Sequence, residues 1–167
     1  MKKFSILLVT LFLISLLGCN KTNSLTDLKV KVDKYVDYWN TVNFDGIKDI
    51  LSEDFELIES PKFEPQKGIE AFKQNLLATH QAYPDFHLDI NEMIYDKNKI
   101  ACIWTVTATG KGHSDSTLIN KPIKISGISV IHFKDGKIKD EWLAKNEYYW
   151  LQQLGYSFVP PSSETKK

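Results

Sequence analysis

The spacing of the apolar residues changes at Pro84, and this change limits the possible folds more than any other feature of the chain. Before Pro84, apolar side chains recur every three or four residues, as in amphipathic helices: Leu28, Val32, Tyr35, Val36 and Trp39, then Ile69, Phe72, Leu76 and Leu77. After Pro84 they alternate with polar residues, as in half-buried strands: Phe86, Leu88 and Ile90, then Ile100, Cys102, Trp104 and Val106. Helices followed by strands predict an α+β domain with an antiparallel sheet.

A hairpin is predicted in the last third of the chain. One strand from about 123 to 133 and another from 137 to about 145 flank Asp135-Gly136, a dipeptide typical of tight hairpin turns. The first of these strands is apolar on both of its faces, so we expect both faces to be covered. A short final helix near 148–154 is predicted to end at Gly155.

The first residues have the pattern of an export signal. Lys2 and Lys3 precede an apolar run, Phe4 to Leu17, that is shorter than the roughly 20 residues of a membrane-spanning helix. The run ends in Leu16-Leu17-Gly18-Cys19, which resembles the lipobox of bacterial lipoproteins. That resemblance implies an exported, membrane-anchored lipoprotein of the cell envelope, with the lipid on Cys19. An ordinary signal peptide or an uncleaved anchor is the alternative.

We therefore expect four segments along the chain. Residues 1–18 form a signal peptide, and residues 19–24 hold the lipidated cysteine and a short tether. Residues 25–158 form one domain, which is an ordinary size for a single core. Residues 159–167 form a disordered tail.

The charge composition argues against nucleic acid as a partner. The chain has 21 basic and 21 acidic residues, and every basic residue is a lysine, so the arginine forks of nucleic-acid-binding proteins are missing. The sequence contains no glycine-rich phosphate loop and no cluster of cysteine and histidine residues, so we expect no cofactor and no metal. Cys102 is interpreted as a small buried residue without a disulfide partner.

From Tyr38 to Gly155 the chain resembles the SnoaL-like polyketide cyclases, also called ester cyclases, of the NTF2-like superfold. Four stretches carry the resemblance: Trp39-Asn40 with Phe44-Asp45-Gly46, Tyr83-Pro84-Asp85, the hairpin 131–138 with Glu141-Trp142, and Gln152-Gln153-Leu154-Gly155. Residues 110–121 do not match the family. The resemblance implies a cone, in which a strongly curved, mostly antiparallel sheet is wrapped by N-terminal helices around a pocket.

The same resemblance implies an aldol-type ring closure of a polyketide ester, in which a buried aspartate works beside a histidine as acid and base. The histidine position corresponds to His132. The aspartate position, counted back from the last motif, falls on Asn146, whose amide can hydrogen-bond a ligand but cannot exchange a proton near neutral pH. Asp140 is the nearest acid that could replace it. The family reaction therefore cannot be carried over intact.

The hairpin decides whether His132 faces the pocket. A two-residue turn at Asp135-Gly136 places His132 opposite Lys139, on the face away from Trp142. A three-residue loop, with its glycine in the left-handed conformation, shifts the pairing by one residue and brings His132 onto the face of Trp142. The pocket interpretation of His132 therefore requires the three-residue loop.

Three tryptophans, Trp39, Trp104 and Trp142, are the candidate substrate-binding walls of the pocket, although plain core packing would also explain each of them. The polar candidates have structural alternatives as well: sheet packing or a dimer face for His132, a solvated strand end for Asp140, and a helix cap for Asn146.

Two functions remain open. One is an enzyme for cyclisation or another proton transfer on a small, largely apolar carbonyl compound. The other is a lipoprotein that holds such a ligand without converting it, and a homodimer is possible in either case.

Overall fold

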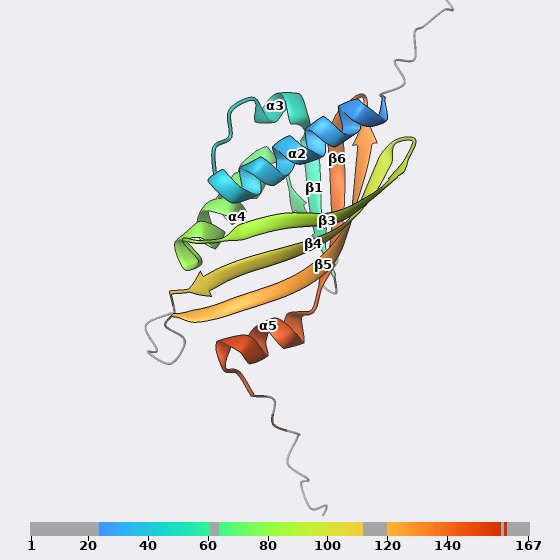
Figure 1. Cartoon of the computed structure of the whole chain (residues 1–167). Helices are drawn as coiled ribbons and strands as arrows, with labels where there is room; N and C mark the ends of the chain where they lie inside the picture. Colours follow the sequence, from blue (N-terminus) through green and yellow to red (C-terminus); the bar gives the residue numbers. More distant parts are fainter. Residues whose placement is uncertain (1–23, 61–63, 112–119, 158, 160–167) are drawn as a thin grey trace, which may run out of the picture.

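The computed structural model describes residues 24–60, 64–111, 120–157 and 159 (Figure 1). Helices and strands follow one another in this order: α2 (Leu25–Thr41), α3 (Ile47–Ile50), β1 (Leu51–Glu59), β2 (Gln66–Lys67), α4 (Ile69–Ala82), β3 (His87–Asp96), β4 (Lys99–Gly110), β5 (Lys121–Lys134), β6 (Lys137–Lys145) and α5 (Glu147–Leu154). The predicted change from helix to strand near Pro84 is confirmed for the long elements, and the strands β1 and β2 lie before it.

The strands form one six-stranded sheet in the order β2-β1-β6-β5-β4-β3. All neighbouring pairs are antiparallel except β1 and β6, which run parallel. The sheet is strongly curved, with α2 and α4 on its hollow side and α5 at one end (Figure 1). The predicted α+β class, a curved and mostly antiparallel sheet wrapped by N-terminal helices, is confirmed.

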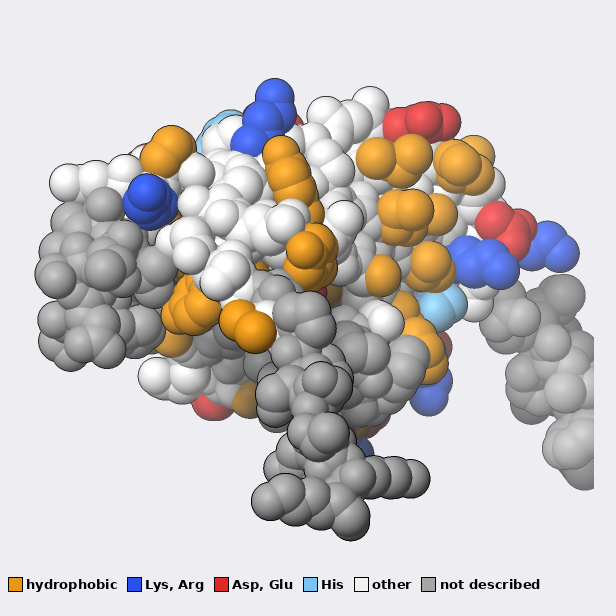
Figure 2. Space-filling model, turned by 90° about the horizontal axis from the view of Figure 1, so that it is seen from below, with side chains coloured by type: hydrophobic (Ala, Val, Ile, Leu, Met, Phe, Trp, Pro, Cys, Tyr) orange, Lys and Arg blue, Asp and Glu red, His pale blue; other side chains and the backbone are white. Residues whose placement is uncertain are grey.

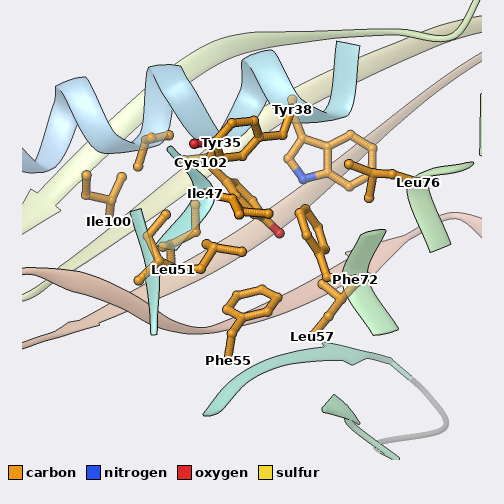
Figure 3. Close-up of a cluster of buried hydrophobic side chains, with 14 of the residues drawn as sticks. Tyr35, Tyr38, Ile47, Leu51, Phe55, Leu57, Phe72, Leu76, Ile100 and Cys102 are labelled. Carbon is orange, nitrogen blue, oxygen red and sulfur yellow. The ribbon is translucent and has the colours of Figure 1, made fainter. Parts of the chain in front are cut away.

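The core lies between α2, α4 and the sheet. Helix α2 starts with a capping box, in which the Ser24 hydroxyl accepts from the backbone of Asp27 and the Asp27 carboxylate accepts from the backbone of Ser24. The apolar side of α2 then packs on α4, where the rings of Tyr35 and Phe72 stack with centroids 5.3 Å apart. Phe55 of β1 meets Phe72 edge-on, at 5.4 Å, so aromatic rings fill the space between helices and sheet (Figure 3).

Strands β5 and β6 are joined by a two-residue turn at Asp135-Gly136, and not by the three-residue loop that the pocket interpretation of His132 requires. Asp135 and Gly136 both have positive φ angles, 50° and 77°, as a type I′ turn requires. A bulge follows at once, because Lys139 of β6 has no partner in β5 and His132 pairs with Asp140 instead. The bulge shifts the pairing by one residue, as the longer loop was expected to do.

The outer side of the sheet, which faces away from α2 and α4, carries an exposed apolar patch. We call it the outer apolar patch, and its members lie side by side on β3 to β6: Ile94, Ala101, Ile103, Ile128, Val130, Trp142 and Ala144. Ile128 is 54% exposed, so the prediction that both faces of this strand are covered is wrong for the outer face. Seen from below, apolar side chains gather on the surface with charged ones beside them (Figure 2).

The predicted signal peptide, Cys19 and most of the tether lie outside the described residues, as does nearly all of the predicted tail. Among the helices that the structure describes, none has the length and apolar character needed to cross a membrane.

Candidate functional site

Two adjacent chambers lie on the hollow side of the sheet. The inner chamber has a volume of about 60 Å³, and the residues used below line it: Tyr35, Cys102, Trp104, Ser129, Ile131 and Glu141. The outer chamber has a volume of about 290 Å³, and its lining includes Glu59, Tyr83, Lys145 and Trp150. Three residues, Trp39, Phe86 and Val106, line both chambers. These three side chains therefore lie at the boundary between the two chambers.

Glu141 is a buried acid in the wall of the inner chamber. Strand β6 places it opposite Ile131 of β5, and it is only 6% exposed. The hydroxyl of Tyr35 donates a hydrogen bond to its Oε2 atom at 2.5 Å. Burial raises the pKa of the Glu141 carboxyl above its usual value, and the nearby hydroxyl groups of Ser129 and Tyr35 offset only part of the rise.

The titratable neighbours of Glu141 in the chamber stay neutral at physiological pH. Burial raises the pKa of Tyr35 well above its usual value, and the nearby Glu141 raises it further. Burial also raises the pKa of the Cys102 thiol to about 12, so that this cysteine is a poor nucleophile. Glu141 is therefore the side chain of the inner chamber that is suited to exchanging protons, because a raised pKa brings a carboxyl group closer to working pH.

Charged side chains line part of the outer chamber. The ammonium group of Lys145 lies 2.7 Å from Oε1 of Glu59 and 3.5 Å from Oε2 of Glu147. It also lies over the ring of Trp150, 4.2 Å from the ring centroid, which is a cation–π contact. These contacts tie α5 to β1 and β6, and they place an ion pair in the wall of the outer chamber.

Two of the three predicted aromatic walls lie in the chambers. Trp39 of α2 lines both chambers and Trp104 of β4 lines the inner one. Trp142 lies on the outer side of the sheet and is 47% exposed. Side chains of β6 alternate between the two sides of the sheet, so Trp142 cannot share the inner side with its neighbour Glu141.

His132 and Asp140 lie together, but on the outer side of the sheet. His132 Nδ1 and Asp140 Oδ1 are 2.6 Å apart, and neither side chain lines a chamber. The expected position of both residues in the pocket is therefore corrected: the bulge at Lys139 did bring His132 to the face of Trp142, but that face is the outer one. A catalytic role for either residue stays a prediction of the sequence.

Asn146 lies at the start of α5, between the sheet and the helix. Its side-chain oxygen accepts a hydrogen bond from the backbone nitrogen of Tyr149 at 2.9 Å, which makes it the N-cap of α5. The structural alternative considered for this residue, a helix cap, is the arrangement that the structure contains. An asparagine at this position is explained by the cap.

Glu141 was not among the predicted site residues, because the bulge at Lys139 reverses the alternation along β6. In a regular strand, the buried Ile138 would lie on the same side of the sheet as Asp140 and Trp142. The bulge changes this, so that Ile138 lies on the same side of the sheet as Glu141. Two signals in the sequence could have identified Glu141. It belongs to the family motif Glu141-Trp142, and it lies two residues before the apolar Leu143, so both side chains point to the same side of the strand.

In the described part of the chain, no group of three or more His, Cys, Asp or Glu residues could hold a metal ion.

A curved sheet, helices on its hollow side and a buried acid in the chamber between them define the ketosteroid isomerase-like, or NTF2-like, class of cone-shaped domains. A protein from Catenulispora acidiphila DSM 44928 with a ketosteroid isomerase-like fold, solved in complex with trimethylamine, superposes with a TM-score of 0.64 at 13% identity, over 78% of this chain and 97% of that one. Within this class the chain belongs to the SnoaL-like polyketide cyclase family, whose model matches residues 29–154.

Solved structures of this family have the same fold. A candidate polyketide cyclase from Bacillus cereus ATCC 10987 is 25% identical, with a TM-score of 0.65 over 78% of this chain and 81% of that one. A SnoaL-like polyketide cyclase from Agrobacterium tumefaciens str. C58 is 19% identical, with a TM-score of 0.64 over 77% and 98%. None of the curated proteins compared with the chain matches it.

Proposed function

We propose that this SnoaL-like domain binds a small, largely apolar carbonyl compound in the two chambers and that Glu141 exchanges a proton with it. The observation that carries the proposal is the buried Glu141 carboxyl, hydrogen-bonded by Tyr35 in an apolar chamber. The outer chamber alone approaches the lower size limit of small-molecule sites, which is roughly 300 Å³. We expect the body of the ligand to fill the outer chamber and its reacting end to enter the inner one.

The proposed chemistry is the removal of a proton from a carbon next to a carbonyl group. The Glu141 carboxylate takes the proton, the bonding electrons move to the carbonyl oxygen, and an enolate forms. The enolate carbon then attacks a second carbonyl of the same ligand in an aldol-type ring closure, and Glu141 returns the proton to the oxygen that becomes negative. An apolar chamber favours such transfers when the bound ligand displaces water from it.

The alternative is a binding protein without turnover. To separate the two, the full-length chain in mild detergent is incubated with an extract of its own cells, and all small molecules are followed by untargeted mass spectrometry. Loss of one compound in large molar excess over the chain, stopped by Glu141→Gln, supports the enzyme. Depletion of at most one molecule per chain, reversed on denaturation, supports the binding protein. His132→Ala is the matched variant on the outer side of the sheet, and it should leave either result unchanged.

We also propose that the chain is exported and anchored by a lipid on Cys19. The support is the sequence Leu16-Leu17-Gly18-Cys19 after a charged start and an apolar run. The test is the mass of the mature N-terminal peptide from the producing cells. A diacylated cysteine at position 19 supports the proposal, whereas an unmodified cysteine or an intact N-terminus argues against it, and Cys19→Ser should release the chain from the membrane fraction.

A third proposal concerns the outer apolar patch, which we assign to a second copy of the chain. Side chains in two neighbouring rows form this patch, one running from Ile94 to Trp142 and one from Ile103 to Ala144. Contiguous apolar surfaces of this kind are uncommon on monomers, and two sheets can pack face to face around a two-fold axis. Sedimentation should show a dimer that Ile128→Asp converts to a monomer. Leu77→Asp, at an exposed apolar residue of α4, is the control and should leave the dimer intact.

A further inference from the structure

A third hollow lies beside the outer chamber, between the end of α4 and helix α5. Its volume is about 800 Å³, which lies within the roughly 300–1,000 Å³ of small-molecule sites. Apolar side chains from both helices line it, among them Ala78 and Ala82 of α4 and Leu151 and Leu154 of α5. We call this hollow the α4–α5 cleft.

The α4–α5 cleft adjoins the outer chamber at two aromatic residues. Tyr83 and Trp150 line both hollows, and their ring centroids are 5.9 Å apart, with the ring planes tilted by 52°. The three side chains that line both chambers lie in the same way between the outer chamber and the inner one. The cleft, the outer chamber and the inner chamber therefore form a row of three adjacent hollows, and Glu141 lies in the wall of the last.

Both helices that form the cleft are bonded to the sheet, near the end where β4 finishes and β5 begins (Figure 1). The end of α4 is tied to the end of β4, because the backbone nitrogen of Lys111 donates to the carbonyl oxygen of Ala82 at 3.0 Å. Helix α5 is tied to β5 through Gln153, whose side chain accepts from the backbone nitrogen of Lys124 at 2.7 Å and donates to its carbonyl oxygen at 3.1 Å. Each helix is held in place by the sheet, so the space between them is a fixed part of the fold.

The charges around the cleft favour an uncharged occupant. Among the described residues that line it, Lys111 and Glu147 are the charged ones, and their charges are opposite. Glu147 also lies 3.5 Å from the ammonium group of Lys145. A charged group buried between the apolar walls would lose its hydration without gaining a partner of its own, whereas an apolar group loses nothing on leaving water. The occupant that suits this cleft is therefore an apolar part of a small molecule.

We infer that the α4–α5 cleft is the third part of the ligand site, and that the ligand is a long-chain carbonyl compound. Its carbonyl end lies in the inner chamber, and its apolar tail passes Tyr83 and Trp150 into the cleft. The inference rests on the proposed function of the two chambers and names the substrate class more closely. With volumes of about 60 and 290 Å³, the chambers hold the carbonyl end and the first part of the chain, and the cleft takes the rest.

The test measures the binding of methyl alkyl ketones, with alkyl chains from hexyl to dodecyl, to the full-length chain in mild detergent. Binding is followed in the nuclear magnetic resonance spectrum through the indole N–H signals of Trp39 and Trp104, which line the chambers. Each affinity is expressed as the ratio of wild type to variant for the same ketone. Partition of the ketone into the detergent is the same for both proteins, so it cancels in this ratio.

Two matched variants on α4 separate the cleft from the rest of the helix surface. Ala78→Phe adds a ring at an exposed position in the wall of the cleft. Leu77→Phe is the control, because Leu77 is the preceding residue, is 47% exposed and does not line the cleft. Leu151→Asp changes the opposite wall, and it should weaken the binding of long chains because a carboxylate beside an alkyl chain loses its hydration.

For Ala78→Phe, the ratio should be close to one with methyl hexyl ketone and should rise to roughly tenfold or more with methyl dodecyl ketone. Such a loss corresponds to about two methylene groups, since each buried methylene group is worth about fourfold in affinity. Leu151→Asp should show the same dependence on chain length. Leu77→Phe should give a ratio near one for every ketone of the series.

Two results would contradict these expectations in different ways. If the ratios for Ala78→Phe and Leu151→Asp do not change with chain length, the tail does not enter the cleft and the inference is wrong, even though the short ketones bind in the chambers. If no ketone of the series moves the signals of Trp39 and Trp104 in the wild type, the chambers do not bind such carbonyl compounds. The proposed function then fails, and the inference fails with it.

Discussion

The hydroxyl group of Tyr35 lies 2.5 Å from the carboxyl group of Glu141, although the two residues are 106 positions apart in the chain. One comes from the first described helix and the other from the last strand of the sheet. Their contact joins the two halves of the domain in the wall of the inner chamber. Most of what can be tested about this protein follows from that pair and from the side chains around it.

The stability of the domain should depend on the protonation of Glu141. Because burial raises its folded-state pKa, the unfolded chain releases the proton first as the pH rises, and the free energy of unfolding falls between the two pKa values. The contribution is therefore present below the usual glutamate pKa and is lost as pH rises through the raised folded-state value. Glu141→Gln should flatten this slope in urea denaturation measured across the acidic-to-neutral range. An unchanged slope would show that Glu141 is not its source.

Tyr35→Phe should destabilise the domain by about 1–3 kcal/mol, because it removes the hydroxyl that donates to the buried Glu141 carboxylate at 2.5 Å. The loss should be larger at neutral pH than at acidic pH, since a protonated carboxyl group needs the donor less. Urea denaturation at two pH values measures both effects. Phe72→Leu, which changes the neighbouring ring without removing a hydrogen bond, is the control and should give a loss that is independent of pH.

Gly127→Ala should displace Trp104 from the inner chamber. An added Cβ atom would lie 2.2 and 2.3 Å from two ring carbons of Trp104 and 2.7 Å from the carbonyl oxygen of Ala144, so the ring must move. We expect a loss of about 1–3 kcal/mol, as for other overpacked cores, and a red shift of the tryptophan emission. Ser126→Ala, on the outer side of the same strand, should change neither quantity.

Asn146→Ala should destabilise the domain by about 1 kcal/mol, because α5 loses its N-cap. Asn146→Asp should be nearly neutral, since aspartate caps helices as well as asparagine does. If Asn146 held a ligand instead, Asn146→Asp would change ligand depletion in the extract experiment while stability stayed constant. Thermal unfolding of the three proteins, side by side with that experiment, separates the two roles.

The fold could be predicted from the sequence because it depends on periodic patterns that survive in a single chain. The helical spacing of apolar residues before Pro84 and the alternation after it gave the element types and their order. The parallel pairing of β1 with β6 was not predicted, because β1 is far from β6 in the sequence and strand pairing over such distances leaves no local signal. The resemblance to SnoaL-like proteins supplied the closure of the sheet.

The candidate site was harder to predict, because a single inserted residue controls it. Lys139 bulges from β6, and no side-chain pattern marks it as the bulged position. Shifting the phase of a strand by one residue moves every side chain to the opposite face. The prediction grouped His132 with Asp140 and Trp142 correctly but put them on the wrong side, and Glu141 was therefore overlooked. Trp39 lies on a helix and Trp104 on a strand upstream of the bulge, so their predicted places in the chamber were unaffected.

The parallel pair of β1 and β6 also bears on how the chain acquires its structure. Until β6 is synthesised, the only described sheet partner of β1 is the two-residue strand β2, and the inner chamber lacks the wall that carries Glu141. Contacts between distant parts of a chain form late, because the intervening segment must first be ordered. We therefore expect the nascent chain to remain open and flexible until nearly its full length has been made, which is the state in which a polypeptide can be threaded through a narrow pore.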